Sequence, residues 1–264
     1  MFYWLLAGRR MGYFKTNRID QKSRAKGLLF QALVFVIVTG FSTSSFATHI
    51  VGGEIFYECL GGDQYLVTLH LYRDCILGEA EFDDPATITV FNSSGAIFTT
   101  LYPNFAGANV LEVEVDNPCL QVSPIVCVDH AVYESEVSLP FLAGGYQVVY
   151  QRCCRNNSIL NLSNPQDAGA TYYLNISELA LNTCNGSPQF DEFPPVALCA
   201  DNPLFFDQSA TDPDGDLLVY SLCDPFHGAS PAIPAPDPDS PPPYQFVTWA
   251  PGFRLLRALR TLNG

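Results

Sequence analysis

The stretch GYQVVYQRCCRN, residues 145–156, places two adjacent cysteines at the end of an apparent β-strand. Its aromatic and β-branched residues are typical of strands. Because successive side chains of a strand point to opposite faces, we expect Cys153 and Cys154 to form disulfides with two different partners. A disulfide between the two neighbours is the alternative.

Similar runs lie on both sides of this stretch, and turn-forming residues separate them. Several short strands at this spacing, with proline and glycine between them, favour an antiparallel sandwich over a helical fold. We therefore predict an all-β protein with an immunoglobulin-like β-sandwich domain over residues 48–186. The other expected strands are YLVTLHLY (65–72), ATITVF (86–91), VLEVEV (110–115), VYESEVSL (132–139) and TYYLNI (171–176), and SELALNTC (177–184) is expected to form one short turn at most.

A second unit is expected over residues 187–253, and its extended entry segment contains the proline pair 194–195. It holds fewer residues than the roughly 100 of a complete immunoglobulin-like sandwich, so we predict an incomplete second β-sandwich domain. The proline-rich segment 228–244 is predicted to be a long loop with polyproline II character, and a linker is the alternative. The expected strands are LFFDQSA (204–210), DLLVYSLC (216–223) and YQFVTWA (244–250).

The first 47 residues have the order of a secretory signal peptide. Basic residues up to Lys26 precede the apolar run LLFQALVFVIVT (28–39), and small residues follow up to Ala47, where we place the cleavage site. The apolar run is shorter than the roughly 20 residues of a membrane-spanning helix. We therefore expect a secreted, extracellular or cell-surface protein with no transmembrane segment after signal cleavage.

The last eleven residues, RLLRALRTLNG (254–264), differ in character from everything before them. They are basic, and the spacing of their apolar residues is helical. We interpret them as an aberrant tail of a truncated or frame-shifted piece of a longer protein. A genuine C-terminal helix is the alternative.

The charge of the exported part is strongly negative. Of the 27 acidic residues only Asp20 precedes Ala47, and six arginines are the only basic residues after it, so the net charge beyond Ala47 is near −20. Such a surface repels nucleic acid and anionic lipid and suits divalent cations, while solubility alone is the simpler explanation. We expect the partner to be an extracellular protein or a polysaccharide surface, and not nucleic acid.

All nine cysteines follow the cleavage site, and in an oxidising compartment this density favours disulfides over metal ligation. No C-x-x-C pattern occurs, and the four histidines are scattered. Because nine is odd, one thiol is expected to be free, to pair between chains or to have lost its partner. The disulfide candidates are Cys59, Cys75, Cys119, Cys127, Cys153, Cys154, Cys184, Cys199 and Cys223.

The segment SATDPDGDLLVYSL (209–222) contains the best local motif. Asp212, Asp214 and Asp216 alternate around Gly215 in a predicted turn between two strands. Carboxylate oxygens that converge on a tight loop are what Ca²⁺ requires, so we predict a calcium site there. The alternative is an acidic turn whose aspartates bond to their own backbone.

No catalytic constellation stands out. Neither G-x-S-x-G nor H-E-x-x-H occurs, so we predict no enzyme and no catalytic residues. A copper site at an N-terminal His49 would require cleavage after Thr48 instead of Ala47. The separate histidines His70 and His130 are expected to be surface or hydrogen-bonded structural residues.

Several segments resemble a known group of proteins: ATHIVGGEIFYECLG (47–61), YLVTLHLYRDC (65–75), GYQVVYQRCCRN (145–156), FDQSATDPDGDLLVYSLC (206–223) and PPPYQFVTWAPGF (241–253). They are similar to the N-terminal region of very large secreted surface proteins of Bacteroidetes, the gliding-motility-associated or PKD-domain proteins with a type IX secretion sorting domain. Residues 206–223 also resemble the opening half of PKD and cadherin-like immunoglobulin-fold repeats. In cadherin-like repeats the acidic turn binds Ca²⁺, and the resemblance implies the same role for Asp212 and Asp214.

These features together predict a non-enzymatic secreted or cell-surface adhesion or structural module, the N-terminal part of a larger gliding-motility-associated type of surface protein. The alternative is a glycan-binding accessory domain of a secreted hydrolase. Its support is the abundance of tyrosine and phenylalanine, some of which could form an exposed stacking platform.

Overall fold

The computed structural model describes residues 50–253, except 77, 79, 112–125, 194, 197–202 and 204. The described residues belong to one compact unit that begins at Ser45. The predicted signal peptide (1–47), the predicted tail (254–264), Cys119 and Cys199 lie outside the described residues.

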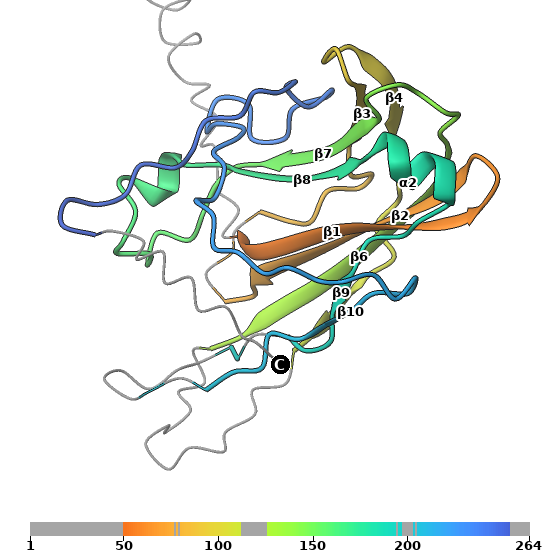
Figure 1. The fold of residues 1–264 in the computed structure, drawn as a ribbon. Helices are drawn as coiled ribbons and strands as arrows, with labels where there is room; N and C mark the ends of the chain where they lie inside the picture. Colours follow the sequence, from red (N-terminus) through yellow and green to blue (C-terminus); the bar gives the residue numbers. More distant parts are fainter. Residues whose placement is uncertain are drawn as a thin grey trace, which may run out of the picture. The chain divides into compact units, whose positions relative to one another are not determined.

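Two four-stranded antiparallel sheets form the body of this unit (Figure 1). Their core residues come from both sheets and pack into one cluster, so the fold is the all-β antiparallel sandwich that the sequence predicts. The first sheet has the order β1 (Ile50–Gly61), β2 (Gln64–Asp74), β6 (Val128–Ser138) and β5 (Ala108–Val110). The second has the order β4 (Ile97–Leu101), β3 (Ile88–Asn92), β7 (Tyr146–Arg152) and β8 (Ala170–Ile176).

The strand patterns around residues 65–72, 86–91, 132–139, 145–151 and 171–176 all became strands. Two further strands, β1 and β4, were not predicted. β1 contains Gly52, Gly53 and two glutamates that interrupt the alternation of apolar residues. It forms because it pairs with β2 along almost its whole length, from Ile50 opposite Arg73 to Gly61 opposite Gln64. Of the expected strand 110–115, Val110 belongs to β5, and residues 112–115 lie outside the described residues.

Tyrosine rings fill much of the space between the sheets. Tyr65, Tyr133 and Tyr150 are fully buried. Two of their hydroxyl groups find partners on one residue: Tyr133 donates to the backbone oxygen of Asp83, and Tyr150 donates to its Oδ2, each over 2.8 Å. Arg152 Nη1 lies 2.6 Å from the same carboxylate. Asp83, whose carboxylate is paired with Arg152, thus supplies hydrogen-bond acceptors to the buried hydroxyl groups of Tyr133 and Tyr150, which offsets the cost of burying them.

A short helix follows the last strand of the second sheet. α2 (Glu178–Thr183) begins after Ser177, whose side chain accepts a hydrogen bond from the N–H of Ala180. It ends at Cys184, which adopts the left-handed conformation with φ 53°. The sequence led us to expect a single turn here. The other short elements are the 3₁₀ helix η1 (Pro165–Asp167) and the two-stranded sheet of β9 (Gln189–Phe190) and β10 (Ala210–Thr211).

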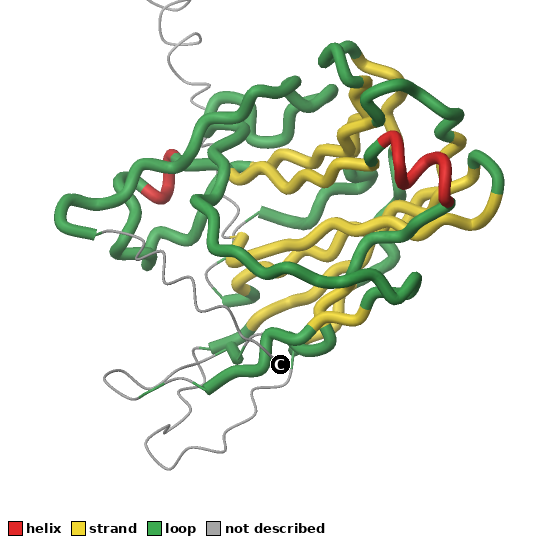
Figure 2. Tube along the Cα trace, in the orientation of Figure 1, coloured by secondary structure: helices red, strands yellow, loops and turns green. Residues whose placement is uncertain are grey.

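The part of the chain after residue 187 is mostly loop (Figure 2). The strands expected at 204–210, 216–223 and 244–250 are wrong as strands: among their described residues, only Ala210 belongs to a ladder, and Phe246 and Trp249 make isolated bridges. A β-rich pattern becomes a strand only where a partner edge is available, and the prolines of 228–244 remove backbone donors. The domain boundary at residue 187 stays a prediction.

Residues 224–247, which we call the strap, lie on the outer face of the second sheet (Figure 1). Phe226 and Tyr244 contact Tyr173 of β8, with ring centroids 5.3 and 5.7 Å away. Under the strap, Phe91 and Val149 are fully buried although they point away from the sandwich core. The proline-rich segment therefore forms a loop that packs on the second sheet of the sandwich.

One aspartate anchors the strap. Asp239 is 2% exposed, and its carboxylate accepts hydrogen bonds from the N–H groups of Thr89 and Gln151, over 3.1 and 2.8 Å. These donors belong to β3 and β7, whose mutual pairing ends at Thr89 and Val149. The carboxylate thus satisfies two backbone groups at the point where the two strands separate.

Candidate functional site

The acidic turn predicted to bind calcium is held by its own side chains. Asp212 Oδ1 accepts hydrogen bonds from the backbone N–H groups of Asp214 and Asp216, over 2.9 and 3.1 Å. Gly215 has φ +76°, and its N–H donates to the backbone oxygen of Asp212. The glycine is required because side chains rarely adopt this backbone conformation. The structure therefore has the turn chemistry that we gave as the alternative.

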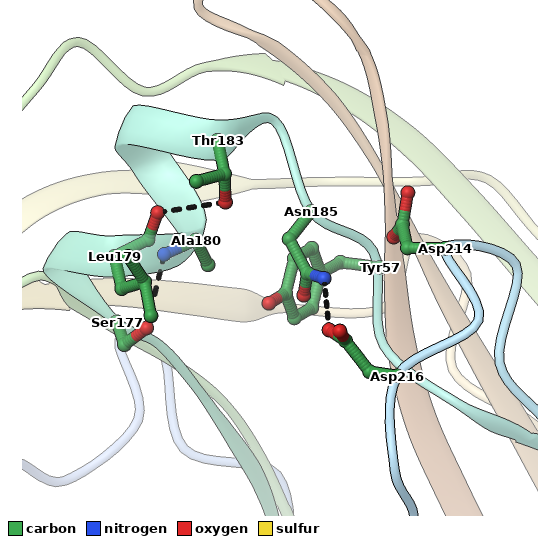
Figure 3. A pocket seen from close by; sticks show the side chains of 8 residues that line it. All are labelled: Tyr57, Ser177, Leu179, Ala180, Thr183, Asn185, Asp214 and Asp216. Carbon is green, nitrogen blue, oxygen red and sulfur yellow. Dashed lines mark hydrogen bonds between the residues drawn. The ribbon is translucent and has the colours of Figure 1, made fainter.

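The turn is also bonded to the segment that follows α2. Asp214 Oδ2 accepts a hydrogen bond from the N–H of Gly186 over 2.6 Å. Asp216 Oδ2 accepts one from the side-chain amide of Asn185, also over 2.6 Å (Figure 3). Cys184, one residue before Asn185, forms a disulfide with Cys59 of β1. The acidic turn is therefore fixed against a cross-linked part of the sandwich.

These contacts border a pocket of about 360 Å³ between α2 and the acidic turn (Figure 3). Tyr57 lies between the two sides, and burial, with smaller contributions from Tyr65, Asp214 and Asp212, raises its pKa to about 12. The tyrosine is thus neutral at physiological pH. The hydroxyl of Thr183 donates to the backbone oxygen of Leu179, and Ser177 caps the helix, so both are already used by α2. The carboxylates of Asp214 and Asp216 are the charged groups of this pocket.

The three aspartates do not gather around one point. In the described part of the chain, the one group of three ligand-type side chains with donor atoms within 4.8 Å of each other is Cys75, Cys127 and Asp129. Its two cysteines form a disulfide, so they cannot act as thiolate ligands. Calcium at Asp212, Asp214 and Asp216 stays a prediction, and it requires the carboxylates to turn from Gly186 and Asn185.

Among the described residues, six cysteines form three disulfides: Cys59–Cys184, Cys75–Cys127 and Cys153–Cys154. The expectation that Cys153 and Cys154 pair with different partners was wrong. β7 ends at Arg152, so the two cysteines lie beyond the strand, and the alternation of side chains that we assumed no longer applies there. Cys153 and Cys154 are both buried, directly after the end of β7. Cys223 is exposed and carries a free thiol.

A polar cluster on the outer face of the first sheet was not predicted from the sequence. Glu54 Oε1 accepts a hydrogen bond from the hydroxyl of Tyr72 over 2.8 Å and lies 3.1 Å from His70 Nδ1. The ring of His130 lies 5.0 Å from Tyr72 and 4.7 Å from His70. We treated both histidines as isolated because 60 residues separate them. The register of β2 and β6 brings them together: it places Tyr72 opposite His130.

Comparisons with known proteins give one partial match. Over 94 residues the chain is 34% identical to integrin beta-like protein A of Dictyostelium discoideum, which is 31% of this chain and 5% of that protein. The chain thus spans about one-twentieth of the length of this relative. No protein-family model matches the chain, and no solved structure matches it. In the described residues no helix is long and apolar enough to cross a membrane.

The disulfides indicate an extracellular or cell-surface protein.

Proposed function

We propose that the chain is a non-enzymatic adhesion or structural module, exported to the cell surface as the N-terminal part of a larger surface protein of the gliding-motility-associated type. The observation that carries this proposal is the way disulfides fasten the sandwich. Cys59–Cys184 joins the end of β1 in the first sheet to the residue after α2, which continues from the second sheet. Cys75–Cys127 joins β2 to β6 at one end of the first sheet.

Such cross-links suit a module that works outside the cell, where no chaperone refolds it. The similarity to an integrin beta-like protein supports the same class. Because the matched region is only 5% of that protein, the similarity supports the class of protein and no particular partner. The negative charge beyond Ala47 supports an extracellular protein or polysaccharide surface as the partner, and it opposes nucleic acid.

Adhesion can be tested directly with microspheres that carry the oxidised chain. We expect them to attach to cells of the producing organism more than albumin-coated microspheres do, and we expect reduction of the disulfides to abolish the difference. The measurement is the number of microspheres retained per cell under flow. Equal retention of the two kinds of microsphere would contradict the proposal.

A further inference from the structure

A second pocket, of about 330 Å³, lies on the outer face of the first sheet. Gly52 and Glu54 of β1 and Tyr72 of β2 form one side. The segments on either side of the β9–β10 pair return over these strands and supply Phe193 and Phe206. In Figure 1 the segment that contains β9 and β10 runs beside β1, β2 and β6.

The walls of the pocket are aromatic, and the orientation of two of them is fixed. The rings of Tyr72 and Phe193 meet edge to face, with centroids 5.8 Å apart. Both rings also contact His130, which stacks on Tyr72 and meets Phe193 at 5.2 Å. Phe190, which also lines the pocket, is 59% exposed, and Phe193 is 47% exposed, so the pocket opens to solvent between them.

A glycine leaves room at the floor. A Cβ atom at Gly52 would lie 3.5 Å from Cδ2 of Tyr72, which is ordinary contact. Any larger side chain at this position would extend over the ring of Tyr72 and into the pocket. The space above Tyr72 therefore depends on glycine at residue 52, which gives a way to close the pocket without changing its walls.

The pocket is negatively charged. Hydrogen bonds from His70 and Tyr72 lower the pKa of Glu54 against the opposing effect of burial, so this carboxylate is ionised at neutral pH. Glu192 is exposed at the same pocket, and no arginine or lysine is among the lining residues. His70 of β2 lies 3.1 Å from Glu54 and is its partner, while Arg73 of the same strand forms ion pairs with Asp129 and Glu81.

This combination restricts the chemistry of a ligand. A sugar needs both donors and acceptors, yet the hydroxyl hydrogen of Tyr72 is already bonded to Glu54, and the amide of Gln208 is the one remaining side-chain donor of the lining. An anion would be repelled, and a neutral apolar ligand would remove water from the carboxylates of Glu54 and Glu192 without adding a hydrogen bond to either. A cation is attracted both by the carboxylates and by the faces of the aromatic rings.

We propose that this pocket binds an organic cation: an ammonium group, carried either by a small quaternary ammonium compound or by a lysine side chain of a partner protein. The inference is independent of the adhesion proposal, because it rests on the lining residues alone. A pocket of this volume lies at the lower end of the range for ligand sites, which fits one ammonium head group and its substituents.

The test is titration of the intact, oxidised chain with four probes, followed by NMR shifts of the Gly52 and Gly53 amides and by calorimetry. The probes are choline, its neutral carbon analogue 3,3-dimethylbutan-1-ol, an Nα-acetyl-lysine amide, and glucose. We expect saturable binding of a cation, roughly tenfold tighter than that of the neutral analogue. Binding of choline without binding of the lysine amide would identify a small molecule as the ligand. Binding of the lysine amide as tightly as choline would identify a lysine side chain of a partner protein.

Two variants locate the binding. Gly52→Leu should abolish the binding of choline, and Glu54→Gln should weaken it roughly tenfold. Glu58→Gln, four residues further along the same strand, is the matched control and should bind as the unaltered chain does. Unfolding curves check that each variant is folded. Equal affinity for choline and its neutral analogue, preferential binding of glucose, or no saturable binding of any cation would each overturn the proposal, and these three outcomes need no variant.

Discussion

Two runs of similar composition form different structures in this molecule: one is a buried strand, and the other is an exposed loop. GYQVVYQ (145–151) forms β7, in which Val148 and Val149 are fully buried. DLLVYSLC (216–223) has the same β-rich character, but its Leu217 and Val219 are 92% and 86% exposed, and none of its residues belongs to a strand. The first run lies between β3 and β8. The second has no neighbouring strand among the described residues.

The comparison shows that the strand pattern is necessary but not sufficient. Apolar residues that alternate with polar ones specify a face to bury, and burial requires a partner sheet. In the region up to Ile176 every strand of the two sheets pairs with at least one neighbour, and β2, β3, β6 and β7 each pair with two. The region after residue 187 supplies side chains that cover sheets already formed.

The largest effect is expected in the first region, where a disulfide joins the two sheets of the sandwich. The double variant Cys59→Ala with Cys184→Ala removes a disulfide that closes a loop of 125 residues. We expect the free energy of unfolding to fall by about 4 kcal/mol, because the unfolded chain gains freedom. Guanidinium unfolding measures the loss. Cys223→Ala, which removes the exposed free thiol, is the control and should change little. An unchanged midpoint in the double variant would show that the disulfide does not hold the fold.

A matched pair of substitutions tests the comparison itself. Val148→Ala leaves a cavity in the core and should cost about 2–3 kcal/mol. Val219→Ala removes an exposed side chain and should change the stability by less than about 0.5 kcal/mol. Urea unfolding of both variants gives the two values. If Val219→Ala costs as much as Val148→Ala, the 216–223 run is buried in solution, and the second sandwich that we predicted is formed after all.

The attachment of the strap should depend on pH. Burial raises the pKa of Asp239 to about 7, although hydrogen bonds from Thr89 and Gln151 oppose the shift. The folded chain therefore binds this proton more tightly than the unfolded chain, whose aspartate has a pKa near 3.9. Stability from this group is complete below about pH 4 and is lost as the pH rises to about 7, a loss on the order of 2 kcal/mol between pH 5 and 8.

The control for this dependence is Asp239→Asn, which cannot titrate. Unfolding free energies of both chains are measured from pH 5 to 8, and the difference between the two curves isolates Asp239 from the histidines. As the pH rises, the unfolding free energy of the unaltered chain should fall relative to that of the variant. Parallel curves would mean that the carboxylate does not titrate in this range.

The smallest effect is expected at the acidic turn. Calcium binding requires the carboxylates of Asp214 and Asp216 to turn from Gly186 and Asn185, and the loss of those hydrogen bonds offsets part of the stabilisation. Millimolar Ca²⁺ should raise the melting temperature by a few degrees over EDTA. Asp214→Asn should remove this increment, and Glu58→Gln should keep it. A midpoint that does not respond to Ca²⁺ would leave the turn with its hydrogen-bonding role alone.

The sequence predicted the sandwich because an enrichment in β-branched and aromatic residues is a local signal. The runs at 65–72 and 171–176 carry it in their own residues, and both became strands. β1 was missed since its glycines, Gly52 and Gly53, hide the alternation, and only its pairing with β2 shows it to be a strand. Local patterns cannot supply that information.

The sites were harder to predict for the same reason. The acidic turn was found because its three aspartates are neighbours in sequence. The cluster of Glu54, His70 and His130 depends on the register of three strands, and no spacing in the sequence reveals it. The pairing of Cys153 with Cys154 depended on one residue: the strand ends at Arg152, a boundary that sequence patterns place poorly.

The anchor of the strap also has a consequence for how the protein is made. Asp239 bonds to Thr89 and Gln151, which precede it by 150 and 88 residues. As the chain emerges from the ribosome or the export channel, both strands are complete long before Asp239 arrives. Until then Phe91 and Val149 lie bare on the second sheet, so the nascent sandwich passes through a stage in which this face is open to chaperones and to other nascent chains.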